Sequence, residues 1–160
     1  MIKNIEAVFK YITHGVYVIS VNNGEQKNVF TAAWVMQVSF DPPLVCFSIN
    51  PEHYSYQLLK QGGVCCINVL DSGQLVTADH FGRSDIKDKM KGYSWQETVT
   101  KAPALVDSLA YFDCRVDHFS DAGDHKLAVC KVIDAAILNE GSPLLYNDTK
   151  KMDKSSALYR

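Results

Sequence analysis

Short β-branched and aromatic segments, separated by tight-turn signals, recur along this chain and constrain its fold more than any other feature. Residues 16–21 (VYVISV) are apolar on both alternating faces. The Asn22-Asn23-Gly24 sequence that follows supplies the left-handed backbone of a tight turn, and a second β-rich segment begins at Val29. The sequence therefore predicts an antiparallel hairpin near the start of the chain.

Further strands are predicted for residues 29–38, 44–49, 64–70, 110–119 and 125–138. Asp41-Pro42-Pro43 ends the first of these, because proline cannot donate a hydrogen bond to a central ladder. A doubly wound parallel sheet would alternate strand and helix throughout. The hairpin-rich order instead predicts an antiparallel barrel or sandwich decorated by short helices.

Two helices are predicted beside the strands. Residues 2–12 carry apolar side chains at helical spacing: Ile5, Val8, Phe9 and Ile12. The second helix is expected to begin with Asn50 as its cap and Pro51 at its first position, and to end at Gly62-Gly63. Residues 71–92 are expected to form a loop with short helical turns.

The strand at residues 110–119 alternates in polarity, which is typical of a half-buried strand. One face is expected to carry Ala110, Phe112, Cys114, Val116 and His118. The opposite, more polar face is expected to carry Tyr111, Asp113, Arg115 and Asp117.

The composition excludes several classes of protein. Sixteen Lys and Arg residues against eighteen Asp and Glu give a net charge of −2, which argues against a nucleic-acid partner. No uncharged apolar run approaches the roughly 20 residues that cross a bilayer, so we expect no membrane association. Five cysteines without a Cys-x-x-Cys pair predict a reducing, cytoplasmic location. The five histidines form no metal-ligand motif, so no metal site is expected.

The length of 160 residues suits a single domain, with a polar tail at 147–160 that is expected to be mobile or to lie at an interface. Nucleophile-elbow, phosphate-loop, zinc-protease and Gly-x-Gly-x-x-Gly signatures are all missing. Hydrolase, nucleoside triphosphatase and metalloprotease functions therefore have no support.

Four polar features remain as candidates, and each has a structural alternative. Residues 31–34 (TAAW) suit a flat ligand lying against backbone amides, or close packing under a helix. Ser55 stands where a helix begins, so it could hold an anion or cap the helix. Basic residues at 83–91 could balance a phosphate or form a solvated face. His125 follows a turn, where it could meet either a ligand or water.

Taken in order, several segments resemble the flavin reductase family, whose members have an FMN-binding split-barrel fold. The most specific segment is residues 31–43 (TAAWVMQVSFDPP), which resembles the family's Thr-Ala, Ser and Pro-Pro signature. The supporting segments are 55–60 (SYQLLK), 66–70 (CINVL), 80–83 (HFGR), 123–125 (GDH) and 143–146 (PLLY). The resemblance runs from about residue 7 to 146 and implies a mainly β, antiparallel split barrel with short peripheral helices.

The resemblance also implies roles for individual residues. The isoalloxazine ring of FMN would be lined by Thr31, Ala32, Ala33 and Trp34. The ribityl chain and phosphate would be approached by Ser39, Ser48, Asn50, Ser55 and Tyr56. The phosphate end would be closed by Phe81, Arg83 and Lys89.

His125 matches the family's Gly-Asp-His motif, which lies beside the flavin where the nicotinamide enters, so it is the expected catalytic residue. The implied reaction is hydride transfer from NADH or NADPH to flavin N5, followed by electron delivery to an acceptor. The family is typically homodimeric. An alternative that the resemblance leaves open is a flavoredoxin-like carrier, whose tightly held FMN is reduced by a redox-protein partner rather than by NAD(P)H.

Overall fold

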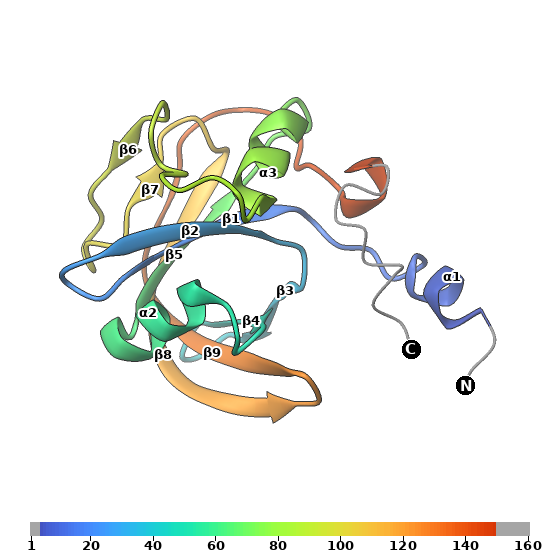
Figure 1. Ribbon diagram of the computed structural model, residues 1–160, viewed down its shortest axis with the longest axis horizontal. Coiled ribbons are helices and arrows are strands. Elements are labelled where there is room, and N and C mark those ends of the chain that lie inside the picture. The colour runs from blue at the N-terminus through green and yellow to red at the C-terminus, as the bar shows by residue number, and fades with distance from the viewer. Residues whose placement is uncertain (1–3, 150–160) are drawn as a thin grey trace.

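A computed structural model describes residues 4–149 of the chain (Figure 1). Its helices are α1 (Ile5–Phe9), α2 (Tyr54–Gly62), α3 (Leu75–Gly82) and the short 3-10 helix η1 (Tyr146–Thr149). Its strands are β1 (Tyr17–Asn22), β2 (Lys27–Ala32), β3 (Val35–Ser39), β4 (Leu44–Ile49), β5 (Val64–Val69), β6 (Trp95–Gln96), β7 (Ala104–Leu105), β8 (Ala110–Ala122) and β9 (His125–Ile137). The mainly β, antiparallel character predicted from the sequence is confirmed.

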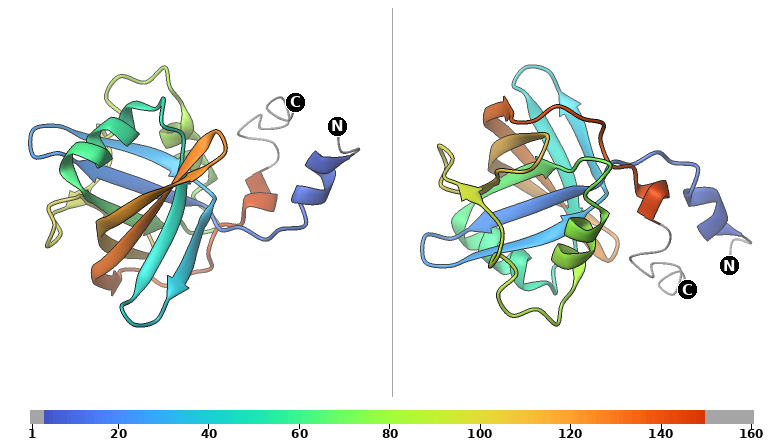
Figure 2. Two further views of the ribbon diagram at one scale, coloured as in Figure 1. Left: turned by 90° about the horizontal axis from the view of Figure 1, so that it is seen from below. Right: turned by 90° about the horizontal axis from the view of Figure 1, so that it is seen from above.

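One sheet contains the strands in the order β2-β1-β5-β8-β9-β4-β3, with every neighbouring pair antiparallel. Its two edges, β2 and β3, are separated along the chain only by Ala33 and Trp34. Three Cα steps span at most about 11 Å. The two edges must therefore meet at this link, and the sheet curls into a barrel, as the views in Figure 2 show.

The break at Ala33–Trp34 corrects the prediction of one continuous strand over residues 29–38. The backbone N–H of Val35 bonds back to the carbonyl of Ala33 at 3.1 Å, while the N–H of Ser48 on β4 bonds to the carbonyl of Trp34 at 3.0 Å. The chain thus changes partner at this point. Propensity alone could not indicate the break, because the residues on both sides favour strands.

Side-chain alternation along β1 builds two cores on opposite faces of the sheet. Ile19 joins a cluster inside the barrel with Phe47 and with Leu59 of α2. Val18 joins a second cluster with Phe81 of α3. Both helices therefore lie on the sheet through fully buried apolar side chains, and they frame the β1–β2 hairpin from its two faces (Figure 1).

The alternation predicted for residues 110–119 is wrong in part. Tyr111 and Asp113 are buried, whereas Phe112 remains 38% exposed. The register of β8 against β9 shifts at Asp113/Cys114, and this bulge lets both of these successive residues be buried. In addition, the loop before β7 covers the supposedly exposed face, where the N–H of Thr100 donates to the Asp113 carboxylate at 2.8 Å.

Both helix starts also differ from expectation. The second helix begins at Tyr54 with His53 as its N-cap, because the Asn50 side chain instead accepts the N–H of Glu52 at 2.9 Å and forms a local turn. The first helix is limited to α1 among the described residues, and none of its residues is buried. It projects from the barrel beside η1 (Figure 1).

Part of the tail predicted at 147–160 is structured. Asn147 to Thr149 belong to η1, where the Thr149 hydroxyl donates to the carbonyl of Tyr146 at 2.7 Å. The rest of the predicted tail lies outside the described residues. Between residues 4 and 149, the helices are too short to traverse a bilayer.

Candidate active site

A cavity of about 940 Å³ opens between the β1–β2 hairpin, the start of α2 and the segment that follows α3. Its walls carry Gln26, Lys27, Asn28, Phe30, Thr31, Glu52, His53, Tyr54, Ser55, Phe81, Gly82, Ser84, Ile86, Lys87 and Lys89. The charged lining residues include three lysines and one glutamate, so positive charge predominates. The cavity therefore suits an anionic ligand.

Lys89 is fixed against the end of α3. Its ammonium donates to the carbonyl of Phe81 at 3.0 Å, and the His80 ring nitrogen Nε2 lies 2.8 Å from the Lys89 carbonyl. Burial lowers the pKa of this lysine from its ordinary value. A cation held in this way is positioned for an incoming anion before the anion binds, which reduces the entropy cost of binding.

The hydroxyl groups of the cavity are anchored to the framework. The Thr31 hydroxyl at the end of β2 donates to the carbonyl of Ala78 on α3 at 2.5 Å. Ser55 is buried in the first turn of α2, and the Asn28 side-chain amide donates to its hydroxyl at 3.0 Å. These two contacts join β2 to both helices and fix the width of the cavity.

Trp34 and His125 lie together at the point where the two sheet edges meet. Their ring centroids are 5.3 Å apart and the rings are inclined by 60°. His125 begins β9 directly after the turn at Gly123, and its Nδ1 lies 2.7 Å from the Asp124 carboxylate. Trp34 is 48% exposed, so its face is available to a planar ligand.

This aromatic pair lies near the cationic cavity. His53 lines the cavity, and the charges of both His125 and Lys89 lower the pKa of its imidazole. Interactions of this kind act over a few ångströms to about a Debye length. Thr31 of the cavity wall also lies only three residues before Trp34, so the flat aromatic surface lies close to the cationic cavity.

The structure brings together some of the sequence-predicted residues. Thr31, Ser55, Phe81 and Lys89 line the cavity, and Trp34 lies against His125. Ala32 ends β2 and Ala33 forms the link to β3. On β4, Ser48 is hydrogen-bonded to the backbone of Trp34.

Other predicted residues have different surroundings. Arg83 turns to the Asp85 carboxylate, with Nε and Nη2 at 3.0 and 2.6 Å from its two oxygens, and does not line the cavity. Asn50 forms the local turn described above. Tyr56 is buried edge-on against Phe119, with ring centroids 5.4 Å apart. Ser39 lines a separate apolar groove with Val35, Met36, Phe112 and Val132.

Sequence reasoning did not select His53 or Lys27 as site residues, and it considered Lys87 only as one of the basic residues that could balance a phosphate, although all three line the cavity. The only signal for Lys87 was its place in the basic stretch after α3. His53 and Lys27 carry no motif, and their role depends on how the hairpin and α2 approach one another.

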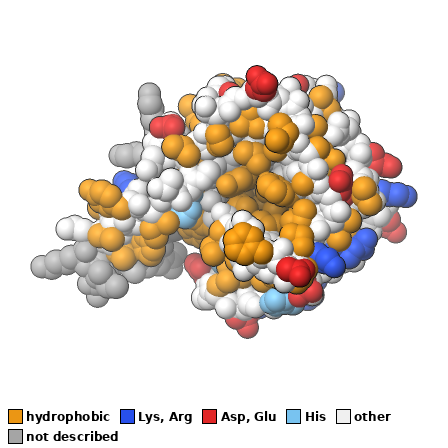
Figure 3. All heavy atoms as spheres, turned by 180° about the vertical axis from the view of Figure 1, so that it is seen from behind, with side chains coloured by type: hydrophobic (Ala, Val, Ile, Leu, Met, Phe, Trp, Pro, Cys, Tyr) orange, Lys and Arg blue, Asp and Glu red, His pale blue; other side chains and the backbone are white. Residues whose placement is uncertain are grey.

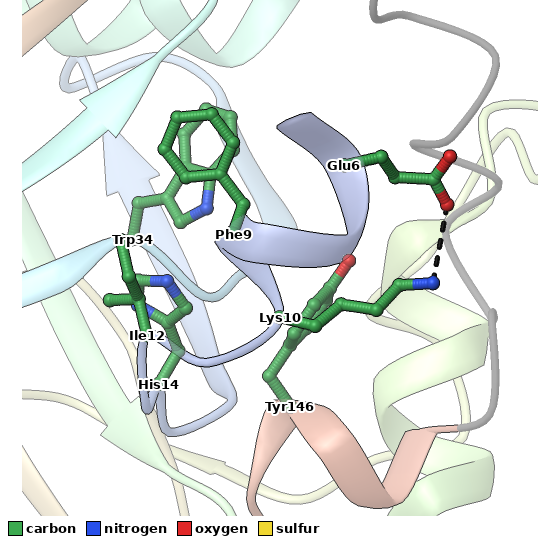
Figure 4. A pocket seen from close by; sticks show the side chains of 7 residues that line it. All are labelled: Glu6, Phe9, Lys10, Ile12, His14, Trp34 and Tyr146. Atoms are coloured by element: carbon green, nitrogen blue, oxygen red, sulfur yellow. Dashed lines mark ion pairs between the residues drawn. The ribbon is translucent and has the colours of Figure 1, made fainter. Parts of the chain in front are cut away.

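A second, smaller cavity of about 360 Å³ has Trp34 and His14 among its lining residues (Figure 4). Phe9 and Ile12 reach it from the α1 segment, and Tyr146 reaches it from η1. Lys10 pairs with Glu6 at 3.2 Å on its rim. Trp34 thus borders this smaller cavity and also contacts His125.

The chain matches the model of the family described as flavin reductase like domain over residues 9–155. It belongs to the flavin reductase family. Among curated relatives, the FMN reductase (NADH) RutF 1 of Methylorubrum extorquens is 31% identical over 140 residues, covering 87% of this chain and 69% of the relative. The resemblance inferred from the sequence segments is therefore confirmed.

Solved structures of this flavin reductase family agree in fold. Nitrilotriacetate monooxygenase component B from Mycobacterium thermoresistibile has a TM-score of 0.82 and 29% identity, covering 89% of this chain and 80% of that one. The NADH:FAD oxidoreductase SgcE6 of Streptomyces globisporus, solved with NAD and FAD fragments, has a TM-score of 0.83 and 25% identity, covering 91% and 87% of the two chains. The split-barrel fold is confirmed.

The residues of this chain fit a phosphorylated flavin. The cationic cavity offers lysine, histidine and hydroxyl groups, which is the donor chemistry that phosphate requires. The Trp34 ring and the small residues Ala32 and Ala33 offer a flat surface to an aromatic ring system. The two parts lie close together, because Thr31 on the cavity wall directly precedes Ala32 and Ala33.

Proposed function

We propose that this protein is an NAD(P)H:flavin oxidoreductase that uses FMN. The observation that carries the proposal is the contact between Trp34 and His125, in which Trp34 lies three residues after Thr31 on the wall of a lysine-lined cavity. Flavin reductases named for their use of NADH are among the relatives, which supports a reductase rather than a carrier reduced by another protein.

Lys89 and Lys87 would hold the flavin phosphate, together with the Ser55 hydroxyl. Lys89 is already fixed by the carbonyl of Phe81, so it needs no rearrangement to meet the phosphate. Thr31, Ala32 and Ala33 would lie along the ring, and the exposed face of Trp34 would bound it. Arg83 would contribute only if its guanidinium left Asp85, so we assign it a lesser role than Lys89.

His125 would place the nicotinamide against the ring. Its Nδ1 contact with Asp124 fixes the orientation of the imidazole, and the side chain is only 23% exposed. When bound, flavin supplies the hydride-accepting chemistry at its N5 atom. The protein's own contribution is to orient both rings and to exclude water, so a catalytic triad is not required.

FMN is favoured over FAD by the curated relative described above, which is named for FMN. The solved NADH:FAD oxidoreductase SgcE6 is named for FAD. The affinities of this protein for FMN and FAD must therefore be compared directly. The charge of the cavity suits the terminal dianion of FMN, which carries about −1.5 to −2 charges at pH 7.

A homodimer is part of the proposal. An apolar groove of about 310 Å³ runs across β3, β4 and β8, and the strands beside it carry exposed apolar side chains. These are Met36, Val38, Phe112, Ile133 and Ile137. Figure 3 shows hydrophobic side chains gathered across one face of the molecule. An exposed apolar surface of this kind is typical of a subunit interface, and a second copy is the occupant that family resemblance supports.

The five cysteines are free and buried, which supports a reducing compartment such as the cytoplasm.

The decisive experiment is an anaerobic stopped-flow titration of FMN-loaded protein with NADH and then NADPH. Rapid, stoichiometric bleaching of the yellow absorbance is expected with at least one nucleotide. If the bound flavin stayed yellow with both nucleotides but bleached with reduced ferredoxin or rubredoxin, the protein would be an electron carrier and the reductase proposal would fail.

A further inference from the structure

His53 occupies a position that the proposed mechanism leaves unused. It is the N-cap of α2, and its side chain lines the cationic cavity together with Lys87 and Lys89. The neighbouring Ser55 is already bonded to Asn28, whereas the structure shows no protein hydrogen bond to the His53 ring among the described residues. The imidazole is therefore placed to serve a ligand of the cavity.

Several charged groups surround this imidazole. Those that face it or share its cavity are Lys27 from β2, Glu52 from its own turn, Lys87 and Lys89 from the segment after α3, and His125 from β9. Partial burial lowers the pKa of His53 most, the charges of His125 and Lys89 lower it further, and Glu52 opposes them. Cations thus outnumber the one carboxylate, and together with burial they favour the neutral form of the ring in the ligand-free protein.

We propose that His53 recognises the flavin phosphate by taking up a proton: its imidazole is neutral in the ligand-free cavity and becomes protonated when the phosphate dianion binds. This inference rests on the flavin assignment made above. His53 would thus act with Lys89 in distinguishing a phosphorylated flavin from riboflavin, and it would do so through this protonation.

Protonation follows because the bound phosphate reverses the sign of the electrostatic potential at His53. A phosphate with about two negative charges more than offsets the neighbouring ammonium groups, so the cavity changes from disfavouring a further cation to favouring one. Protonation then adds a charge-assisted hydrogen bond to the phosphate. Because binding and protonation are linked, affinity for FMN must fall as pH rises from about 7 to 8, by up to tenfold per pH unit.

The test is isothermal titration calorimetry of the full-length protein with FMN and with riboflavin at pH 7.0, in two buffers of different ionisation enthalpy. The buffer dependence of the heat gives the number of protons taken up. We expect about half a proton per FMN and none per riboflavin.

Three variants separate His53 from its surroundings. His53→Gln should abolish the uptake and weaken FMN about ten- to hundredfold, with riboflavin affected less than threefold. His53→Lys supplies a permanent charge, so FMN should bind at pH 7 about as in the parent, without proton uptake and with little change from pH 7 to 8. His118→Gln alters an exposed histidine outside the cavity and should match the parent.

FMN binding without proton uptake in the parent protein would overturn this inference alone, as would uptake that persists in His53→Gln. Failure of the parent to bind FMN would overturn the flavin assignment itself, and this inference with it. The two failures are therefore distinguishable from one set of titrations.

Discussion

Trp34 and His125 form a tilted ring pair, 5.3 Å between centroids, across the junction of the two edges of the sheet. Trp34 belongs to the two-residue link between β2 and β3, and His125 is the first residue of β9. Local backbone structure alone does not bring these two residues together. Their contact exists because the sheet curls until its edges meet, and it defines where the flat part of a ligand would lie.

Replacing His125 should affect catalysis more than flavin binding. In His125→Gln, we expect the rate of flavin reduction by the preferred nucleotide to fall about 10- to 100-fold, because the nicotinamide loses its positioning contact. The dissociation constant of FMN should change less than threefold. Stopped-flow reduction and an FMN titration measure the two quantities, and an unchanged reduction rate would remove His125 from the mechanism.

Lys89 should discriminate between FMN and riboflavin. Lys89→Met keeps most of the apolar stem but removes the ammonium, so FMN binding should weaken by about 1.5–3 kcal/mol while riboflavin binding is nearly unchanged. Lys91→Met is the matched control, because Lys91 lies outside the cavity. Arg83→Ala should have a smaller effect than Lys89→Met, since Arg83 is paired with Asp85. Equal losses for FMN and riboflavin would refute the phosphate assignment.

The apolar groove provides a test of the dimer. Phe112→Asp places a carboxylate beside Met36 and Val132 in the groove, where a second copy could bury it only at a large desolvation cost. We expect a dimer for the parent protein and a monomer for the variant in sedimentation velocity runs at micromolar concentration. Val99→Asp changes an exposed valine outside the groove and should leave the mass unaltered. A parent protein that sediments as a monomer would contradict the proposal.

Gly62 is required where α2 ends against the β1–β2 hairpin. A Cβ atom at this position would lie 1.9 Å from the carbonyl oxygen of Asn22 and 2.6 Å from the Cα of Asn23. Because both obstacles are backbone, Gly62→Ala should destabilise the protein by about 3 kcal/mol. At Gly92 a Cβ meets open space but φ is +87°, so Gly92→Ala should cost only about 1–2 kcal/mol. Urea unfolding of both variants measures the two losses of stability, and a larger loss in Gly92→Ala than in Gly62→Ala would contradict this prediction.

Tyr111 should make stability sensitive to alkaline pH. Its hydroxyl donates to the Asp134 carboxylate at 2.8 Å, and this hydrogen bond, with burial and the charge of Asp134, raises the pKa of Tyr111 to about 12. The ordinary value is 10.0, so the native phenol stays protonated while the unfolded one ionises. The contribution is complete below pH 10 and is lost as pH rises from 10 to 12.

Tyr111→Phe should therefore lower the free energy of unfolding by about 1–2 kcal/mol at pH 7. The difference between parent and variant should shrink at pH 11. Denaturant titrations at the two pH values give the comparison, and a difference that grows at pH 11 would show that the sign of the linkage is wrong.

Local sequence signals predicted several elements of this fold correctly. The strand at residues 44–49 matches β4 at both ends, since a proline pair precedes it and Asn50-Pro51 follows it. Gly24 lies at positive φ in the expected hairpin turn, and Gly123 does so in the turn before His125, as glycine allows without strain. The ordered family segments also indicated Thr31, Ser55 and Lys89, which the structure places on one cavity.

Only the tertiary structure determined the contacts between distant parts of the chain. The link at Ala33–Trp34 breaks a segment with uniform strand propensity, because β3 pairs with β4 and not with β1. Asp113 is buried because a distant loop supplies Thr100. His53 acquires its surroundings from β9 and from the segment after α3, and its charge state depends on both. Sequence patterns act over a few residues, whereas register, burial and electrostatic potential depend on whichever groups the closed sheet brings within a few ångströms of one another.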